Sequence, residues 1–263
     1  MTTEQLRDRF VADRLFVEGD IRMLYSHEDR MVIGGAVPVF GAPLTLPTYD
    51  PLRSGSFCER RELGIVAVGG AGAVVVDGQR YAMEHHDVLY VGSGARDIAF
   101  RAVDADEDAA FYLVAALSHV RHPNRLVRMA DAQVNAAGSA EGANRRTIRK
   151  YIHAEGAASS QLVLGITVLE PGSVWNTMPC HLHDRRTEVY LYLDLSADGR
   201  VIHLMGEPDR TRSIVVADRQ AVISPSWSVH FGAGTRNYSF VWAMAGENQS
   251  FADMDQVAVT ALR

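Results

Sequence analysis

Basic charge is scarce in this sequence of 263 residues, and lysine is almost missing. The chain carries 26 arginine and lysine residues against 32 aspartate and glutamate residues, so its formal net charge is -6. Lys150 is the only lysine, a bias that a GC-rich genome explains because it favours arginine codons. An acidic chain offers no overall basic field for a nucleic acid backbone or an anionic membrane. We therefore expect neither nucleic acid nor a membrane as a partner.

Cysteines and long apolar runs are also scarce. Cys58 and Cys180 are too few for a disulfide framework, so we expect reduced thiols. The opening stretch, MTTEQLRDRFVADRLF, is interrupted by charges and lacks the apolar core of a signal peptide. No stretch has the apolar length that a membrane-spanning helix needs. These features predict a cytoplasmic protein.

Helical periodicity is weak, and turn residues divide the chain into short segments, as in an all-β protein. A short helix is predicted at the start, with Thr2 and Gln5 as a capping box and with Leu6 and Phe10 on one face. Beyond it, segments of four to eight residues rich in Val, Ile, Tyr and Phe alternate with Gly, Pro and Asp-Gly turns. The stretch GAVVVDGQRYAM is typical of a hairpin, because its Asp-Gly pair can take the positive φ of a type I′ turn.

The organisation of the chain suggests a duplication. The stretches GSGARDIAF, residues 92–100, and GAGTRNYSF, residues 232–240, share the pattern G-x-G-x-R-[D/N]-x-x-F. Two tandem β-barrels of related type fit this repeat best. We predict a helical arm and first barrel over 1–120, a linker with some helix over 121–158, and a second barrel over 159–263. The proline-rich stretch 38–51 is predicted to be a surface loop or edge arm, because proline has no amide to donate.

Three metal-capable side chains stand together in the stretch NTMPCHLHDRRTEVYLYLDL, residues 176–195. Residues two apart on a strand face the same side, so His181 and His183 present both imidazoles to one face. Glu188 restarts that face after a short turn. A further imidazole, His230, ends the run SPSWSVH. Three imidazoles and one carboxylate form a ligand set that suits a borderline divalent metal.

The pattern H-x-H-x4-E, followed 42 residues after its glutamate by the histidine of P-x-W-x-x-H, resembles the metal tetrad of the cupin superfamily. Longer stretches resemble the 5-keto-4-deoxyuronate isomerase family over the chain from about residue 15 onward. They are ERRELGIVAVGGAG, NRRTIRKY, VWNTMPCHLHDRRTEVYLYL, QAVISPSWSVHFGAGT and GENQSFADMDQVAVTALR.

This resemblance implies a bicupin that works inside bacteria as a homohexamer on uronates released from pectin and related polysaccharides. It implies one Zn²⁺ per subunit on His181, His183, Glu188 and His230, although Mn, Fe, Co or Ni would also suit these ligands. The first barrel is expected to carry no metal, since alignment of DVLYVGSGAR with AVISPSWSVH puts Arg96 where His230 stands.

The implied reaction converts the aldose 4-deoxy-L-threo-5-hexosulose uronate into the ketose 3-deoxy-D-glycero-2,5-hexodiulosonate. It needs a group that polarises neighbouring oxygens and a base that moves a proton through an enediol. Tyr190 and Tyr192 share the face of Glu188, and Glu62 can enter from another strand. Lys150 can form a Schiff base or contact a carboxylate. These four residues are the catalytic candidates.

An acidic sugar substrate requires local cations, and arginine binds carboxylates in bidentate fashion. The substrate-binding candidates are Arg61, Arg146 and Arg186, together with Trp175 and Trp227, which suit either a pocket wall or the core. The remaining histidines, His203 and His153 among them, have no partner at ligand spacing and are predicted to lie in surface or loop positions.

Two other functions fit the same residues. A cupin dioxygenase also uses imidazole and carboxylate ligands, for iron and oxygen chemistry. A non-catalytic sugar-binding bicupin would use the metal only to organise a pocket. No helix-turn-helix segment with an adjacent basic patch supports a DNA-binding regulator.

Overall fold

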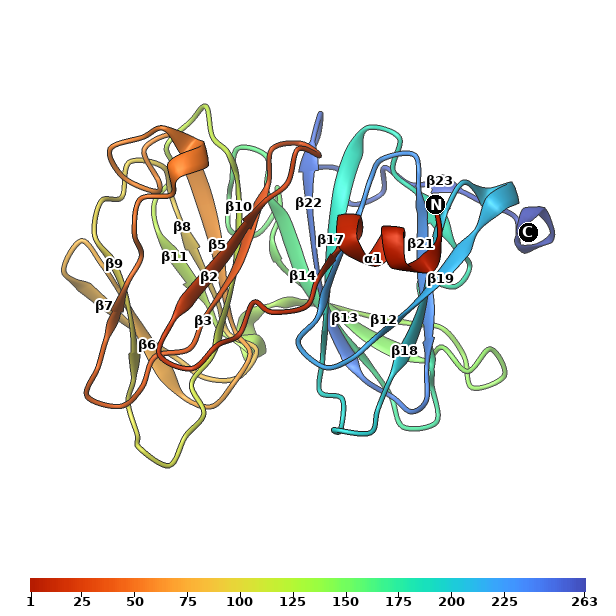
Figure 1. Cartoon of the computed structure of the whole chain (residues 1–263), viewed down its shortest axis with the longest axis horizontal. Helices are drawn as coiled ribbons and strands as arrows, with labels where there is room; N and C mark the ends of the chain where they lie inside the picture. Colours follow the sequence, from red (N-terminus) through yellow and green to blue (C-terminus); the bar gives the residue numbers. More distant parts are fainter. The chain divides into compact units, whose positions relative to one another are not determined.

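The computed structural model describes residues 1–263 and divides them into two compact units, each built from β-strands (Figure 1). We call residues 14–133 and 151–163 the N-terminal barrel, and residues 1–13, 134–150 and 164–263 the C-terminal barrel. The predicted all-β class is confirmed, because α1 (Thr3–Phe10) is the only α-helix. No helix combines the length and the apolar character that crossing a membrane would take.

The N-terminal barrel has a six-stranded sheet, in the order β11-β8-β5-β10-β3-β2, and a four-stranded sheet, in the order β4-β9-β6-β7. The strands of the first sheet are β2 (Ile21–Tyr25), β3 (Val32–Ala36), β5 (Arg61–Ala67), β8 (Val88–Val91), β10 (Phe111–Leu117) and β11 (Arg125–Val127). Those of the second are β4 (Leu44–Thr45), β6 (Gly72–Val76), β7 (Gln79–Met83) and β9 (Ile98–Ala102). Alternate residues such as Leu63, Ile65 and Phe111 fill the core between the sheets.

The C-terminal barrel has a seven-stranded sheet, in the order β1-β20-β17-β22-β14-β13-β12, a four-stranded sheet, in the order β15-β21-β18-β19, and the pair β16-β23. The strands of the large sheet are β1 (Val11–Ala12), β12 (Gln133–Ala137), β13 (Arg146–Ile152), β14 (Val163–Leu169), β17 (Arg186–Leu193), β20 (Ala221–Ser224) and β22 (Ser239–Gly246). The others are β15 (Trp175–Asn176), β16 (His181–Leu182), β18 (Val201–Gly206), β19 (Arg212–Val216), β21 (Val229–Gly234) and β23 (Asp255–Gln256). Four 3-10 turns complete the chain: η1 (Asp50–Leu52), η2 (Met129–Asp131), η3 (Pro208–Arg210) and η4 (Val259–Ala261).

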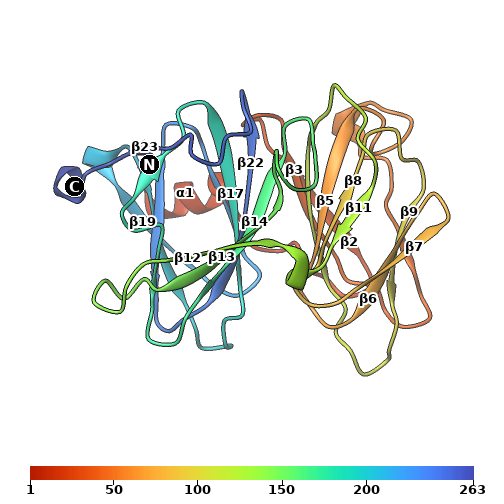
Figure 2. The same ribbon diagram turned by 180° about the vertical axis from the view of Figure 1, so that it is seen from behind.

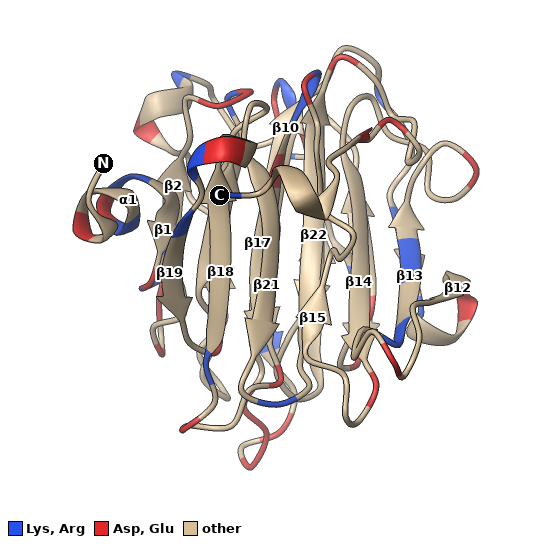
Figure 3. Ribbon diagram, turned by 90° about the vertical axis from the view of Figure 1, so that its right-hand side faces the viewer, with Lys and Arg blue, Asp and Glu red and all other residues tan.

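Figure 3 shows that the charged residues of the C-terminal barrel lie mostly in its loops. The strand β13 is an exception, because it carries basic residues along its length.

The two barrels share one topology. Without the edge strands β1, β11 and β12, the larger sheets read β8-β5-β10-β3-β2 and β20-β17-β22-β14-β13, which match strand for strand. The smaller sheets match in the same way. The nine-residue repeat, however, does not align equivalent strands: residues 92–100 run from β8 to β9, whereas residues 232–240 run from β21 to β22. The matching strand orders therefore support a duplication, but the nine-residue repeat does not lie at equivalent positions of the two barrels.

The predicted boundaries at 120 and 158 differ from the units that the fold forms. The helix α1 packs its apolar face on the C-terminal barrel, and Val11 of β1 pairs with Val222 of β20. The predicted linker contains the strands β11, β12 and β13, and the helix expected there is only η2. The strand β12, with the sequence QVNAA, is largely exposed at the sheet edge (Figure 2), so its residues show no alternation of buried and exposed positions.

Local predictions elsewhere are confirmed. Thr2 and Gln5 form the capping box of α1, and both apolar residues of its predicted face are buried. Asp77 and Gly78 take positive φ values of 47° and 85° between β6 and β7, as the hairpin requires. The proline-rich stretch is mostly loop; it contains the short strand β4, at the end of its sheet, and the first two residues of η1. His153 lies in a loop after β13, as predicted, but its side chain is buried.

Candidate metal centre

Three neighbouring elements of the C-terminal barrel bring the histidines and the glutamate together. His181 lies on the two-residue strand β16, and His183 follows it in the turn before β17. Glu188 lies on β17, where every residue is buried, and His230 lies on β21. Cys180 points away from the histidines into an apolar cluster with Val229 and Phe231, as alternation on a strand predicts.

The four side chains converge closely enough to hold one metal ion. Their donor atoms all lie within 4.8 Å of one another. The Glu188 Oε2 atom is 2.9 Å from His183 Nε2 and 2.8 Å from His230 Nε2. The ring of His181 lies 4.7 Å from that of His183 and 5.0 Å from that of His230, measured between centroids. The predicted tetrad is therefore assembled at one point.

Outer contacts orient two of these imidazoles as metal ligands. His183 Nδ1 lies 2.8 Å from the carbonyl oxygen of Asp253, and His230 Nδ1 lies 3.0 Å from Ser224 Oγ. If each Nδ1–H donates to its oxygen, each Nε2 lone pair is free and faces the Glu188 carboxylate. The buried His230 Nε2 atom accordingly has no hydrogen-bond partner, despite its nearness to that carboxylate. A cation between these lone pairs and the carboxylate removes their repulsion, so the residues fit a metal ion.

The surroundings also hold two of the ligands, His181 and Glu188, in the form that binds metal. Burial lowers the pKa of His181 to about 3, with a further contribution from His230. For Glu188 burial acts to raise the pKa, but its interactions with the neighbouring imidazoles of His230 and His183 outweigh burial, and the pKa falls below its ordinary value. Neutral imidazoles and an ionised carboxylate are the forms that bind metal.

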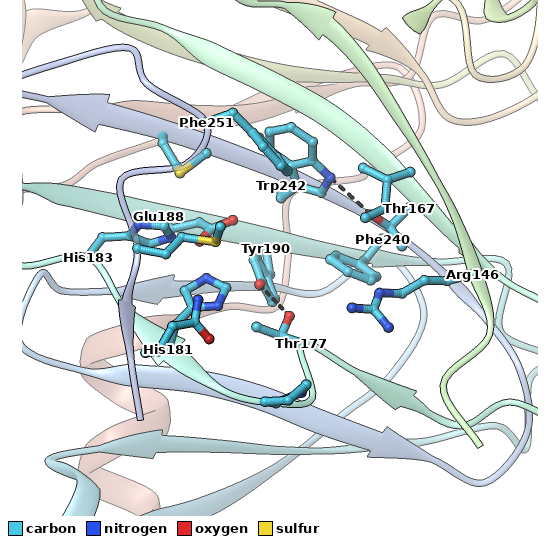
Figure 4. A pocket seen from close by; sticks show the side chains of 15 residues that line it. Arg146, Thr167, Thr177, His181, His183, Glu188, Tyr190, Phe240, Trp242 and Phe251 are labelled. Carbon is cyan, nitrogen blue, oxygen red and sulfur yellow. Dashed lines mark hydrogen bonds and ion pairs between the residues drawn. The ribbon is translucent and has the colours of Figure 1, made fainter. Parts of the chain in front are cut away.

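A cavity of about 250 Å³ opens directly beside this cluster. Its lining includes three of the ligands, namely His181, His183 and Glu188. The other lining residues are Arg146, Ile148, Thr167, Thr177, Pro179, Tyr190, Phe240, Trp242, Met244, Phe251, Met254 and Gln256. In Figure 4 the ligands lie at one end, Arg146 at the other, and Tyr190 with Thr177 between them. The cavity is thus bipolar, with a metal-capable end and a cationic end.

The two tyrosines of β17 have different surroundings. Tyr190 lines the cavity, and its hydroxyl lies 2.8 Å from Thr177 Oγ1. Burial and the nearby Glu188 raise the pKa of Tyr190, so its hydroxyl stays protonated. Tyr192 does not line the cavity, because its hydroxyl is held 2.7 Å from His203 Nδ1 and 3.3 Å from Asn176 Nδ2. The prediction that His203 lies in a surface or loop position is wrong, since the residue is on β18 and fully buried.

Arg146 is the only cation that lines the cavity. It lies on β13, and its NH1 group donates to the carbonyl oxygen of Asn144 at 2.8 Å. Burial lowers the pKa of this guanidinium, and no carboxylate pairs with it. Lys150 lies four residues along the same strand, with Nζ 5.0 Å from the centroid of the Phe251 ring, which lines the cavity.

Comparisons with known proteins agree with this geometry. Residues 13–261 match the family model described as the KduI/IolB family. This chain belongs to the KduI/IolB family. Three relatives cover 100% of the chain, and each is named 4-deoxy-L-threo-5-hexosulose-uronate ketol-isomerase. The proteins of Halalkalibacterium halodurans, Kineococcus radiotolerans and Bacillus subtilis are 50%, 52% and 48% identical, and 95%, 95% and 94% of their lengths are covered.

Solved structures show the fold that this KduI/IolB protein shares. An IolB-like protein from Salmonella typhimurium superimposes with a TM-score of 0.76 at 16% identity, covering 94% of this chain and 96% of that one. Oxalate decarboxylase from Lactobacillus farciminis gives a TM-score of 0.63 at 12% identity, covering 93% and 86%. Both are cupin folds, so the predicted cupin architecture is supported.

Several predicted site residues of this family member lie elsewhere. Arg186 is buried behind His183 and donates to the carbonyl oxygens of Ser250 and Asp253, so it does not face the cavity. Trp175 stacks on Phe231, and Trp227 packs edge-on against α1. The tryptophan that does line the cavity is Trp242, whose indole donates to Thr167 at 3.0 Å. The pattern of β22 resembles that of any core strand and gave no sign of this role.

The C-terminal segment 248–257 was also missed. It supplies Phe251, Met254 and Gln256 to the cavity and the Asp253 carbonyl oxygen to His183. Arg185 holds this segment by ion pairs with the carboxylates of Asp253 and Asp255. The segment is mostly loop and has no apolar period, so only the arginine pair at the start of β17 offered a signal.

Glu62 and Arg61 belong to the N-terminal barrel and do not line this cavity. The Glu62 carboxylate accepts hydrogen bonds from the backbone amides of residues 160, 161 and 162, at 2.6 to 2.7 Å, and from the Tyr90 hydroxyl at 2.8 Å. A carboxylate with four donors and no exposed surface is occupied as a structural acceptor. This occupied carboxylate and its place outside the cavity argue against the predicted catalytic role of Glu62.

We expect Glu62→Gln to lower the free energy of unfolding by about 1–3 kcal/mol, because the new amide group would face backbone amides and leave buried donors unpaired. Turnover per folded molecule should stay unchanged. Denaturant unfolding and isomerase assays check this, with the exposed Glu84→Gln as the matched control. Lost turnover in a fully folded Glu62→Gln protein would return this residue to the catalytic set.

Proposed function

We propose that this KduI/IolB protein is a 4-deoxy-L-threo-5-hexosulose-uronate ketol-isomerase, which converts this aldose to 3-deoxy-D-glycero-2,5-hexodiulosonate in the breakdown of pectin and related uronates. The observation that carries the proposal is the shared name of relatives about half identical over the whole chain. The bipolar cavity supports it independently, because the substrate has carbonyl chemistry at one end and a carboxylate at the other.

The metal we propose is one Zn²⁺ per subunit, held by His181, His183, Glu188 and His230. Three imidazoles and one carboxylate suit Zn²⁺, and Mn, Fe, Co or Ni would also be accepted. A divalent ion in this place supplies a Lewis acid for neighbouring carbonyl and hydroxyl oxygens.

The residues of the chain position the substrate and move protons. Arg146 binds the substrate carboxylate by charge-assisted hydrogen bonds, which fixes the aldehyde end beside the histidine cluster. Phe240, Trp242 and Met244 supply apolar walls that exclude water from the enediol. The Tyr190 hydroxyl lies between the two ends. It donates its proton to the C1 oxygen as that carbonyl becomes a hydroxyl, and it regains a proton from the C2 hydroxyl as that group becomes the carbonyl.

The decisive experiment mixes the purified protein with 4-deoxy-L-threo-5-hexosulose uronate, made by a lyase acting on pectic oligomers, and follows the sugar by NMR. We expect conversion to the 2,5-diketo acid that stops on chelation and returns with Zn²⁺. If the metal-loaded protein converts nothing, the isomerase proposal fails. Oxygen uptake with Fe(II) would then test the dioxygenase, and sugar binding without turnover would support the binding protein.

Arg146→Ala should raise KM about 10- to 100-fold, because hydrogen bonds to a charged group contribute about 1.5–3 kcal/mol. The turnover number should change much less. Steady-state kinetics of the NMR reaction check the split between KM and kcat. Arg149→Ala is the matched control, since Arg149 shares β13 but does not line the cavity. Equal KM values for the wild type and Arg146→Ala would contradict the carboxylate contact.

The family resemblance also leads us to propose a homohexamer that acts in the cytoplasm on a small acidic sugar. Light scattering on the purified chain tests the first part. A monomeric mass under conditions of full activity would contradict it.

A further inference from the structure

The N-terminal barrel contains a second polar cavity, separate from the metal centre. It has a volume of about 170 Å³, and none of its nine lining residues is aspartate or glutamate. Three of the nine are arginines: Arg30, Arg60 and Arg61. In a chain whose net charge is -6, three guanidinium groups around one cavity without a carboxylate need a physical explanation.

Arg61 is the buried member of this cluster, with only 4% of its surface exposed. Its NH1 group donates to the carbonyl oxygen of Arg30 at 2.7 Å, and its guanidinium lies 5.7 Å from the centroid of the Tyr25 ring. A guanidinium has five N–H donors, and these contacts occupy few of them. Burial lowers the pKa of Arg61, Tyr25 partly opposes this, and no carboxylate compensates the charge. A buried cation without a counter-ion is costly, which points to an anion in the adjoining cavity.

The other two arginines approach the cavity from separate loops. Arg30 lies in the turn between β2 and β3, and Arg60 immediately precedes β5, in the same sheet (Figure 1). Arg60 NH2 donates to the carbonyl oxygens of Leu52 and Arg53, both at 3.0 Å, and so fastens the η1 loop at the rim. Arg30 is exposed and has no ion pair. Two anchored guanidinium groups and one free one thus surround the same space.

We propose that this cavity of the N-terminal barrel binds a small oxyanion, that is, phosphate or the carboxylate group of a small organic acid. Planar guanidinium groups bind both by paired hydrogen bonds. At about 170 Å³ the cavity is smaller than the one beside the metal centre, at about 250 Å³, so the site takes the anionic group rather than a whole sugar. This inference does not rest on the isomerase proposal, because no residue is shared between the two cavities.

Isothermal titration of the metal-loaded full chain with inorganic phosphate, at low ionic strength, tests the proposal. We expect Arg30→Ala to weaken phosphate binding about tenfold or more, because it removes charge-assisted hydrogen bonds. Arg30→Lys should restore part of the affinity. Arg80→Ala is the matched control, since Arg80 is an exposed arginine of the same barrel outside the cavity. Arg146→Ala shows whether phosphate enters the other cavity instead.

Acetate competition separates the two ligand sources. Competition between acetate and phosphate would identify a site for oxyanions in general, and phosphate binding that acetate leaves unchanged would identify phosphate. No phosphate binding, or binding that Arg30→Ala and Arg80→Ala weaken equally, overturns the proposal. If phosphate does not bind, the oligomeric mass of Arg30→Glu shows what fills the cavity instead. A changed mass would mean that a carboxylate of a partner subunit occupies it.

Discussion

Glu188→Gln should remove the metal and the isomerase activity together while leaving the fold largely intact. Glutamine has nearly the same volume as glutamate, but it provides no negative charge to the cluster, where the Glu188 carboxylate lies within 2.9 Å of two imidazole nitrogens. Changes to groups that only support a metal ligand cost about 10- to 100-fold in affinity or activity, so losing the ligand itself should cost more than that. His183→Ala should behave in the same way.

Metal content per chain, circular dichroism and the NMR assay together check this expectation. Glu141→Gln makes the same chemical change at an exposed position of the same barrel and should keep both metal and activity. A Glu188→Gln or His183→Ala protein that is fully metallated yet inactive would contradict the ligand assignment. It would mean that these side chains act on the substrate rather than on the ion.

The ligand cluster could be predicted from the sequence because strand geometry ties spacing to direction. His181 and His183 are two apart, so both face the same side whatever the exact length of β16. Glu188 lies on a strand with strong β character, and alternation brings Tyr190 to the same face. These signals depend only on neighbouring residues of one strand, so the side-chain directions that they predict are found in the fold.

The errors have the opposite cause, because they concern partners distant in sequence. Glu62 looked available as a base, but the amides that occupy its carboxylate are about a hundred residues away in the chain. Arg186 looked suitable for a substrate, yet a carbonyl oxygen 67 residues later holds it in the interior. The local pattern predicts which side of a strand a residue faces. It does not predict which distant group the side chain contacts on that side.

The barrel boundaries failed for the same reason. The helix α1 begins the chain, but its apolar face is completed by strands more than two hundred residues later. An exposed edge strand such as β12 has little periodicity, because a hydrogen-bonded neighbour rather than burial of its side chains keeps it in the sheet.

Tyr190→Phe should lower turnover about 100- to 10,000-fold, the range for loss of a positioned acid or base, without loss of metal. Tyr190 is the one titratable residue lining the cavity that is neither a proposed ligand nor the carboxylate-binding arginine. Its hydroxyl is anchored by Thr177 at 2.8 Å, which orients the proton for transfer to a substrate oxygen. KM should change little, because Arg146 and the apolar walls remain in place.

Tyr192→Phe is the matched comparison, because it removes the same hydroxyl two residues along the same strand. The Tyr192 hydroxyl meets only His203 and Asn176 beneath the cavity, so its loss should cost about 1–3 kcal/mol of stability and leave kcat nearly unchanged. Kinetics of the two variants at equal metal content separate catalysis from packing. If Tyr192→Phe lost as much turnover as Tyr190→Phe, proton transfer would have to involve the chain of hydroxyl and imidazole groups that ends at His203. If neither variant lost turnover, the proton would move between substrate oxygens without a tyrosine, and Tyr190 would act as a wall of the cavity.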